Sequence, residues 1–304
     1  MHDKNHNELI TKIQMQADES TTWVKDNRMV CSGEKTKLLI VGTPEMKRKL
    51  DEANVNITTN VCGEVVEVTP SEKLLGLIVN GELSWKEYLY GESWRPNPLE
   101  NFKGLIPTLS QRVGLLKQMR SKMNDEAFNT IANGLFTTYC IHVFGNVWFP
   151  NVEENTRRFR AFTKKDCNRL QILQNKVLRM KLSYPPRHTS CIDLVKMTGN
   201  FSIHQLIAYH TLLQVHKTTQ TNKPRYLSDR LILRKPDNSA IFPMRNLNTI
   251  EVNRNLTVSR SGFIFRGADL WNKLPIDIRS CDKLETFRTK VKNWIREKVP
   301  VKPP

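Results

Sequence analysis

The 304-residue sequence lacks several patterns that mark common classes of protein. No run approaches the roughly 18 consecutive apolar residues that a membrane-spanning helix needs. The N-terminus has no apolar stretch behind a basic start, so a secretory signal is not expected. Neither a glycine-rich phosphate loop nor a G-x-S-x-G nucleophile motif is present. The sequence thus gives no sign of a membrane partner, a P-loop nucleotide site or a serine hydrolase.

The cysteines and histidines show no spacing that is typical of a metal site. No two of the six cysteines fall within a C-x-x-C pattern, which makes a zinc site improbable. Scattered cysteines in a chain of this length are typical of reduced, mostly buried thiols. His204, His210 and His216 are six residues apart, so on a helix they turn by about 240° per step and cannot converge. We expect an intracellular protein, cytoplasmic or nuclear.

The net charge of +17 is unevenly distributed along the chain. Residues 1–90 carry 11 Lys and Arg against 14 Asp and Glu, whereas residues 91–216 have a net charge of +9 and residues 217–304 of +11. A positive field of this size favours a polyanionic partner, and phosphate backbones are the commonest one. A solvated basic surface that aids solubility is the alternative that composition leaves open.

The first third of the chain has a mixed pattern. Apolar residues recur at helical spacing over 7–29, with Trp23 on the apolar side. Short apolar runs at 37–41, 64–68 and 74–79 are typical of buried strands. Asn80-Gly81 favours a tight turn with positive φ after the third run.

The middle of the chain has the periodicity of a helical bundle. An apolar stripe begins at Leu109, and Asn124 or Asp125 can cap the next helix. The segments Thr163-x-x-Asp166 and Ser202-x-x-Gln205 resemble capping boxes, each opening a further helix. Beyond 218 the chain is less regular, with a strand predicted at 261–265 and a final helix that begins near residues 282–285.

These patterns predict an α+β fold that is mainly α. Its predicted parts are a β-containing remnant at 1–89, a proline- and glycine-rich linker at 90–107, a helical domain at 108–218, and a basic C-terminal region with a terminal helix at 219–304.

Four blocks, in order along the chain, resemble the reverse transcriptases of non-LTR retrotransposons of the LINE or jockey type. The first is a Trp-x-x-x-Asn-x-Met element that is followed by Lys-Thr. The second is a hairpin that begins with Leu-Gly and ends in Ser-Trp. The third ends a helical thumb with a basic start, and the fourth is a C-terminal Arg-Gly-x-x-Leu-Trp-Asn-x-Leu-Pro segment. In this sequence the first block is Trp23, Asn27, Met29, Lys35 and Thr36, and the second lies at 75–85. The third is Tyr139, Phe144, Gly145 and Trp148, and the fourth lies at 260–275.

The resemblance implies that the chain is a C-terminal fragment of such an enzyme, comprising the end of the palm, a thumb-like domain and a C-terminal region. The parent family is an RNA-directed DNA polymerase that uses Mg²⁺, held by an early palm carboxylate and an adjacent aspartate pair. This sequence contains no adjacent aspartates. We interpret Asp18 and Glu19, which lie on a helical pattern, as solvated helix-face charges. We therefore expect no catalytic residues, no metal site and no cofactor in this chain, and no polymerase activity by the chain alone.

The resemblance implies nucleic-acid-binding roles for Lys35, Arg112, Lys117 and Arg120. Lys35 would contact a phosphate. On a helix Lys117 and Arg120 lie about 60° apart and can follow one backbone, with Arg112 to one side. The expected function is sequence-independent binding of RNA or an RNA–DNA hybrid. Two alternatives stay open: a helical protein-interaction module without a nucleic-acid role, and a chain completed by a catalytic half on a longer or separate product.

Overall fold

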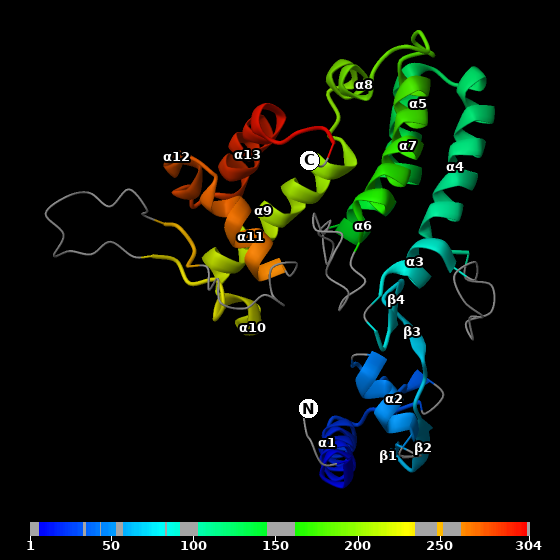
Figure 1. Cartoon of the computed structure of the whole chain (residues 1–304), viewed down its shortest axis with the longest axis vertical. Coiled ribbons are helices and arrows are strands. Elements are labelled where there is room, and N and C mark those ends of the chain that lie inside the picture. The colour runs from blue at the N-terminus through cyan, green and yellow to red at the C-terminus, as the bar shows by residue number, and fades with distance from the viewer. Residues whose placement is uncertain are drawn as a thin grey trace, which may run out of the picture. The chain divides into compact units, whose positions relative to one another are not determined.

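A computed structural model describes residues 6–32, 35–42, 44–52, 57–82, 84–91, 103–144, 162–234, 248–251 and 263–302 (Figure 1). The chain divides into two compact units between Gly104 and Leu105. Helices dominate, and short antiparallel strands occur in the first unit, so the predicted α+β, mainly α class is confirmed. None of the described helices combines the length and the apolar composition that a membrane crossing needs.

The first unit combines helices with two β-hairpins. In chain order its elements are α1 (His6–Asp26), α2 (Pro44–Glu52), β1 (Thr58–Val61), β2 (Glu64–Glu67), β3 (Ser71–Leu74), β4 (Leu77–Asn80) and α3 (Lys86–Tyr90). Strand β1 pairs with β2, and β3 pairs with β4. The helix predicted at 7–29 and the strand predicted at 64–68 are confirmed as α1 and β2, but Trp23 is 60% exposed rather than inward.

The side chains of Gln14 and Thr21 join α1 to the first hairpin, and Thr21 Oγ1 accepts from the Cys62 N–H at 3.2 Å. Gln14 Oε1 accepts hydrogen bonds from the backbone N–H of Asn60 at 2.9 Å and from the hydroxyl of Thr59 at 3.1 Å. Its Nε2 donates to the Asn60 carbonyl at 3.0 Å. The turn between β1 and β2 is made by Cys62 and Gly63, whose φ values of 54° and 90° suit a two-residue hairpin loop.

The second hairpin corrects the strand predicted at 74–79. The chain reverses at Leu75 and Gly76, whose φ values are 50° and 85°, so the run is split between β3 and β4. The predicted positive φ does not occur at Gly81. A glycine is required there for a different reason, because a Cβ would collide with the carbonyl oxygen of Ile40.

The run at 37–41 was also predicted as a strand, and this is wrong. Leu38 makes one isolated parallel bridge, to Val68, and no ladder follows it. A short apolar run satisfies the composition of a strand, but it becomes one only where a partner strand runs along its length. Here the neighbouring backbone turns away into β3 after Thr69, whose N–H donates to the Leu38 carbonyl at 2.8 Å.

The second unit is helical. In chain order its elements are α4 (Leu105–Met119), the 3₁₀ turn η3 (Arg120–Lys122), α5 (Asp125–Ala132), the π-helical turn η4 (Asn133–Thr137), α6 (Thr138–Phe144), α7 (Lys164–Lys181), α8 (Cys191–Thr198), α9 (Ile203–Thr221), α10 (Arg225–Ser228), α11 (Phe263–Asn272), α12 (Ile276–Arg279) and α13 (Leu284–Lys298).

The predicted starts of α5, α7 and α9 are confirmed. Asn124 caps α5 by accepting from the backbone N–H of Ala127 at 2.8 Å. Reciprocal capping boxes open α7 at Thr163 and α9 at Ser202. The residues at 105–107, predicted as linker, are already helical in α4.

Helix α9 is buried on every side rather than on one stripe. It packs against α6, α7, α11 and α13, and its buried residues include polar ones such as Gln205 and Thr211. Thr211 satisfies its hydroxyl on the Ile207 carbonyl at 2.7 Å, and Gln205 Nε2 donates to the Val299 carbonyl at 2.9 Å. A helix covered all round is the centre of its unit.

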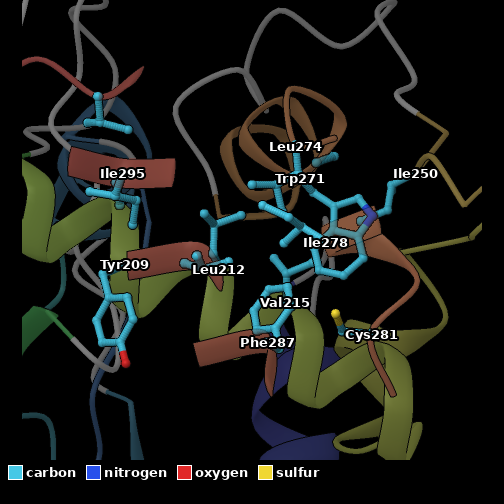
Figure 2. Packing of buried hydrophobic residues seen from close by; sticks show 14 of the residues in the cluster. Tyr209, Leu212, Val215, Ile250, Trp271, Leu274, Ile278, Cys281, Phe287 and Ile295 are labelled. Carbon is cyan, nitrogen blue, oxygen red and sulfur yellow. The ribbon is translucent and has the colours of Figure 1, made fainter. Parts of the chain in front are cut away.

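The C-terminal core forms around Trp271 (Figure 2). Its indole N–H donates to the Asn248 carbonyl at 2.9 Å, and the side-chain amide of Asn272 bonds both the N–H and the carbonyl of Ile250, at 2.7 and 2.9 Å. At Gly267 a Cβ would lie 2.9 Å from Val215 Cγ2, so the glycine permits α11 to approach α9. The C-terminal motif of the sequence is therefore a packing motif in this fold.

Two further predictions for the C-terminal region are corrected. The described part of the strand predicted at 261–265 is the start of α11, because Ile264, Ala268 and Trp271 recur at helical spacing and face the core. The boundary predicted at 218/219 does not separate domains. Helix α9 shares one hydrophobic core with α11 and α13, and all of them belong to the second unit.

Candidate nucleic-acid interface

Of the four predicted binding residues, Lys35 alone lies in the first unit. It is exposed and lies in a short turn, where its backbone N–H donates to the Ser32 carbonyl at 3.2 Å. The hydroxyl of Thr36 donates to the same carbonyl at 2.9 Å. This geometry leaves the Lys35 ammonium at the surface, in the unit whose sequence carries an excess of acidic residues.

Arg112 lies on α4, but its guanidinium is occupied within the protein. The guanidinium carbon lies 3.4 Å from the centre of the Tyr139 ring, in a cation–π contact. One terminal nitrogen donates to the Leu135 carbonyl, within the π-helical turn, at 3.1 Å. These contacts of Arg112 join α4 to η4 and α6. The side chain is half-exposed, so its exposed part could reach a ligand.

Arg120, which the sequence predicts to follow a phosphate backbone together with Lys117, is largely buried and bonds within the protein. Its Nε donates to the Met180 carbonyl at 2.8 Å, one terminal nitrogen bonds Ser183 Oγ at 2.8 Å, and the same nitrogen pairs with the carboxylate of Asp125. Only 13% of the Arg120 side chain is exposed. The Arg120 guanidinium therefore adds a side-chain donor to the carbonyls at the end of α7, where helical hydrogen bonding ends. Lys117 is exposed on α4, as predicted.

A second arginine has the same structural role at the end of α7. Arg179 donates to four backbone carbonyls of the loop before α8, with the shortest distances to Thr189 at 2.7 Å and Pro186 at 3.0 Å. The loop follows two consecutive residues with positive φ, Ser183 and Tyr184, which end the helix. Arginine is suited to this because its planar fork presents several donors at once.

One exposed face of α7 is basic. Lys165, Arg169 and Lys176 are exposed and lie within about 40° of one another around the helix axis. They extend over about 16 Å, which is roughly half a helical turn of duplex DNA. Ile172, which is 56% exposed, lies between them. These residues are not among the four that the sequence predicts, although their spacing of four and seven places them on one helical face.

This face carries no acidic residue because of how α7 begins. The helix has six basic residues and one acidic residue, Asp166. Asp166 is buried, and its Oδ2 accepts from the Thr163 hydroxyl at 2.7 Å and from the Thr163 N–H at 3.0 Å. The capping box therefore withdraws the one carboxylate from the surface. Lys181 does not contribute to this exposed face either, because its Nζ donates to Asn133 Oδ1 at 2.8 Å and burial lowers its pKa.

The carboxylates of α1 are surface groups, as the sequence indicates. Asp18 accepts from Gln14 Nε2 at 2.9 Å and Glu19 from Gln16 Nε2 at 2.8 Å, and both are exposed. Over the described ranges, His, Cys, Asp and Glu form no group of three that could hold a metal ion. Burial lowers the pKa values of all three histidines of α9, of which His216 is buried and His204 and His210 are half-buried.

The arrangement has two parts: arginines that hold helix ends together, and lysine-rich faces that are open to solvent. The second part can attract phosphates by charge without reading bases. Comparisons of this chain with protein-family models, with curated proteins and with solved structures find no match.

Proposed function

We propose that this chain is a fragment of a reverse transcriptase of the non-LTR retrotransposon type, which binds RNA or an RNA–DNA hybrid without sequence specificity and does not polymerise DNA by itself. It acts inside the cell, in the cytoplasm or nucleus. The proposal is supported by the ordered sequence blocks and by the distribution of charge along the chain. The exposed face of α7 is the observation that carries it.

The chemistry of that face favours phosphate contacts. Lys165 and Lys176 are compact, hydrated point charges, and Arg169 lies between them along the helix. Such side chains neutralise phosphates and release counterions, so binding should weaken steeply as salt increases. The same face has no aromatic residue, and a single exposed amide, Asn168, lies beside it, so little sequence preference is expected. Lys117 on α4 adds a further exposed charge to the same unit.

The absence of polymerase activity follows from the sequence. Two-metal phosphoryl transfer needs carboxylates gathered around both ions, and no adjacent aspartates occur anywhere in the 304 residues. The chain is therefore proposed to hold a template–primer rather than to extend it. A catalytic half on a longer or separate product would be needed for synthesis.

The test is a filter-binding or anisotropy titration of a labelled 20-nucleotide RNA over a series of salt concentrations. The triple variant Lys165→Gln, Arg169→Gln and Lys176→Gln should bind more weakly. The slope of log affinity against log salt should fall by about 2, because each lost contact to a single strand contributes about 0.7.

The matched control changes the same number of charges elsewhere. Lys25, Lys37 and Lys73 are exposed in the first unit, so replacing all three by Gln lowers the net charge equally. This control should retain the salt slope of the parent chain. Equal losses in both triple variants would show a diffuse charge effect, and no binding at low salt would favour the protein-interaction alternative. Incorporation of dNTPs by the purified chain with Mg²⁺ would refute the fragment proposal.

A further inference from the structure

A pocket of about 540 Å³ opens between α9, α11 and α13 in the second unit. Its size falls in the range of sites that hold small organic ligands. The floor and walls are largely apolar, and the residues used below are Ile207, Leu270, Trp294, Arg266 and Lys298. It lies apart from the exposed face of α7 in the fold, since none of its lining residues belongs to α7.

The charges that line the pocket are unbalanced toward positive. Three cationic side chains, Arg266, Lys273 and Lys298, face one carboxylate, Asp269. Asp269 is already paired with Lys273 at 2.9 Å. Arg266 and Lys298 have no acidic partner among the residues that the structure describes. An anionic group on a ligand would therefore be attracted to these two.

Arg266 supplies a second and independent observation. Its Nε is buried and has no hydrogen-bond acceptor within the described part of the chain. Buried donors are nearly always satisfied, because leaving one without an acceptor is unfavourable. The Arg266 side chain thus lines the pocket with an unsatisfied donor in a fork that matches a phosphate, and a ligand oxygen reaches this Nε when the side chain shifts outward.

The other polar side chains that line the pocket are Thr211, whose hydroxyl already donates to the Ile207 carbonyl, and His204. His204 Nδ1 lies 3.0 Å from the Pro300 carbonyl, and since a carbonyl can only accept, Nδ1 is the donor. Burial lowers the pKa of His204, so the ring is neutral at neutral pH and Nε2 is left as an acceptor. An apolar pocket with an aromatic wall, a neutral acceptor and two cations suits a flat ring joined to an anion.

We propose that this pocket binds one unpaired nucleotide of a single strand, with its base against Trp294 and Leu270 and its phosphate at Arg266 and Lys298. The inference rests on the proposed function, because the surrounding basic unit would bring the strand to the pocket. Base stacking on an aromatic side chain is tolerant of sequence, so it adds a preference for single strands without base specificity. A duplex, whose bases are already stacked, would gain nothing from the pocket.

The experiment compares a labelled 12-nucleotide oligouridine with a 12-base-pair RNA duplex on the full chain. Trp294→Leu should lower affinity for the single strand about ten-fold, within the range for one stacked base, and leave the duplex within about two-fold. Arg266→Gln should weaken the single strand and reduce its salt slope by about 0.7. Millimolar uridine monophosphate should compete with the single strand on the parent chain but not on Trp294→Leu.

Controls separate folding and general charge from the pocket. Trp23→Leu removes another partly exposed tryptophan, and Lys283→Gln another exposed cation; both should bind like the parent. Because Trp294 also packs on the C-terminal core, thermal unfolding of each variant is measured alongside, and Arg266→Gln gives the answer if Trp294→Leu unfolds.

The outcomes distinguish this inference from the proposed function. If single strand and duplex bind equally and respond equally to both pocket variants, the pocket inference is wrong while the basic-face proposal stands. If neither nucleic acid binds at low salt, the proposed function fails, and the pocket inference fails with it. If laurate displaces the single strand and uridine monophosphate does not, the pocket is a site for aliphatic anions and the inference is overturned.

Discussion

His216 stacks on Phe287, with ring centroids 4.1 Å apart and ring planes inclined by 20°. Its Nε2 lies 2.7 Å from the Cys281 carbonyl, so Nε2 carries the proton. Nδ1 is buried and has no partner among the described residues. Burial lowers the pKa of His216, and this outweighs the raising effects of the Cys281 carbonyl and the Asp282 carboxylate. The core thus depends on a neutral imidazole.

Acid should destabilise the second unit from about pH 6.5 downward. The pKa values of His204 and His210 are lowered by burial as well. As the pH falls below about 6.5, the unfolded chain takes up protons before the folded one, and stability is lost toward the lower folded pKa values. His216→Gln keeps an N–H donor and cannot ionise, so its urea midpoint should fall less between pH 7.5 and 5.5. An identical fall in both proteins would contradict the assignment.

Two helical glycines should respond to alanine in opposite directions. Gly267→Ala places a Cβ 2.9 Å from the branched side chain of Val215 and should cost about 1–2 kcal/mol in the free energy of unfolding. Gly114, inside α4, has nothing within 4 Å of the same position. Gly114→Ala should stabilise the protein by up to about 1 kcal/mol. Chemical denaturation measures both, and stabilisation by Gly267→Ala would show that α11 and α9 are not in close contact.

Arg120 and Lys117 should separate stability from binding. Arg120→Gln removes the bonds to the Met180 carbonyl, Ser183 and Asp125, and should lower the free energy of unfolding by at least about 2 kcal/mol. Lys117→Gln should change it by less than about 0.5 kcal/mol, as expected for an exposed side chain. RNA affinity, corrected for the folded fraction, should fall for Lys117→Gln and stay constant for Arg120→Gln. The reverse result would restore Arg120 as a contact residue.

The cysteines should divide into two groups toward a thiol reagent. Cys140, Cys167 and Cys281 are buried, whereas Cys31, Cys62 and Cys191 are half-buried. Burial raises the pKa of Cys167 to about 12 and that of Cys140 still further, so neither forms the reactive thiolate at neutral pH. Rapid labelling in the native state should therefore be confined to the half-buried group, with full labelling in denaturant. Rapid native labelling of Cys140, identified by peptide mass, would contradict the packing of α6.

Local signals predicted local structure well. Both capping boxes and the Asn124 cap were readable because each depends on residues three apart, so no distant partner is needed. The second hairpin could not be predicted in this way, because Leu75 adopts a positive φ that a leucine side chain does not favour. Only the pairing of β3 with β4 explains this backbone conformation. Whether the apolar runs at 37–41 and 261–265 become strands was likewise decided by distant partners.

The residues of the candidate site likewise divide into those that local spacing predicts and those that depend on distant contacts. Helical spacing places Lys117, Lys165 and Lys176 on exposed faces, and this is visible in the sequence. It does not reveal that Arg120 and Arg179 meet backbone carbonyls at the end of α7, because those contacts join residues on different elements or in a loop. The pocket between α9, α11 and α13 is still less accessible to sequence, since it depends on how three helices pack.

The central position of α9 fixes where this protein can be shortened. A product that stops before α11 or within α13 would keep α9 but uncover Leu212 and Val215, which the last helices shield. Apolar faces of this kind promote self-association when they are exposed to solvent. Expression boundaries chosen at the predicted edge near residue 218 should give insoluble material, and a usable second-unit fragment must run from Leu105 through Val299.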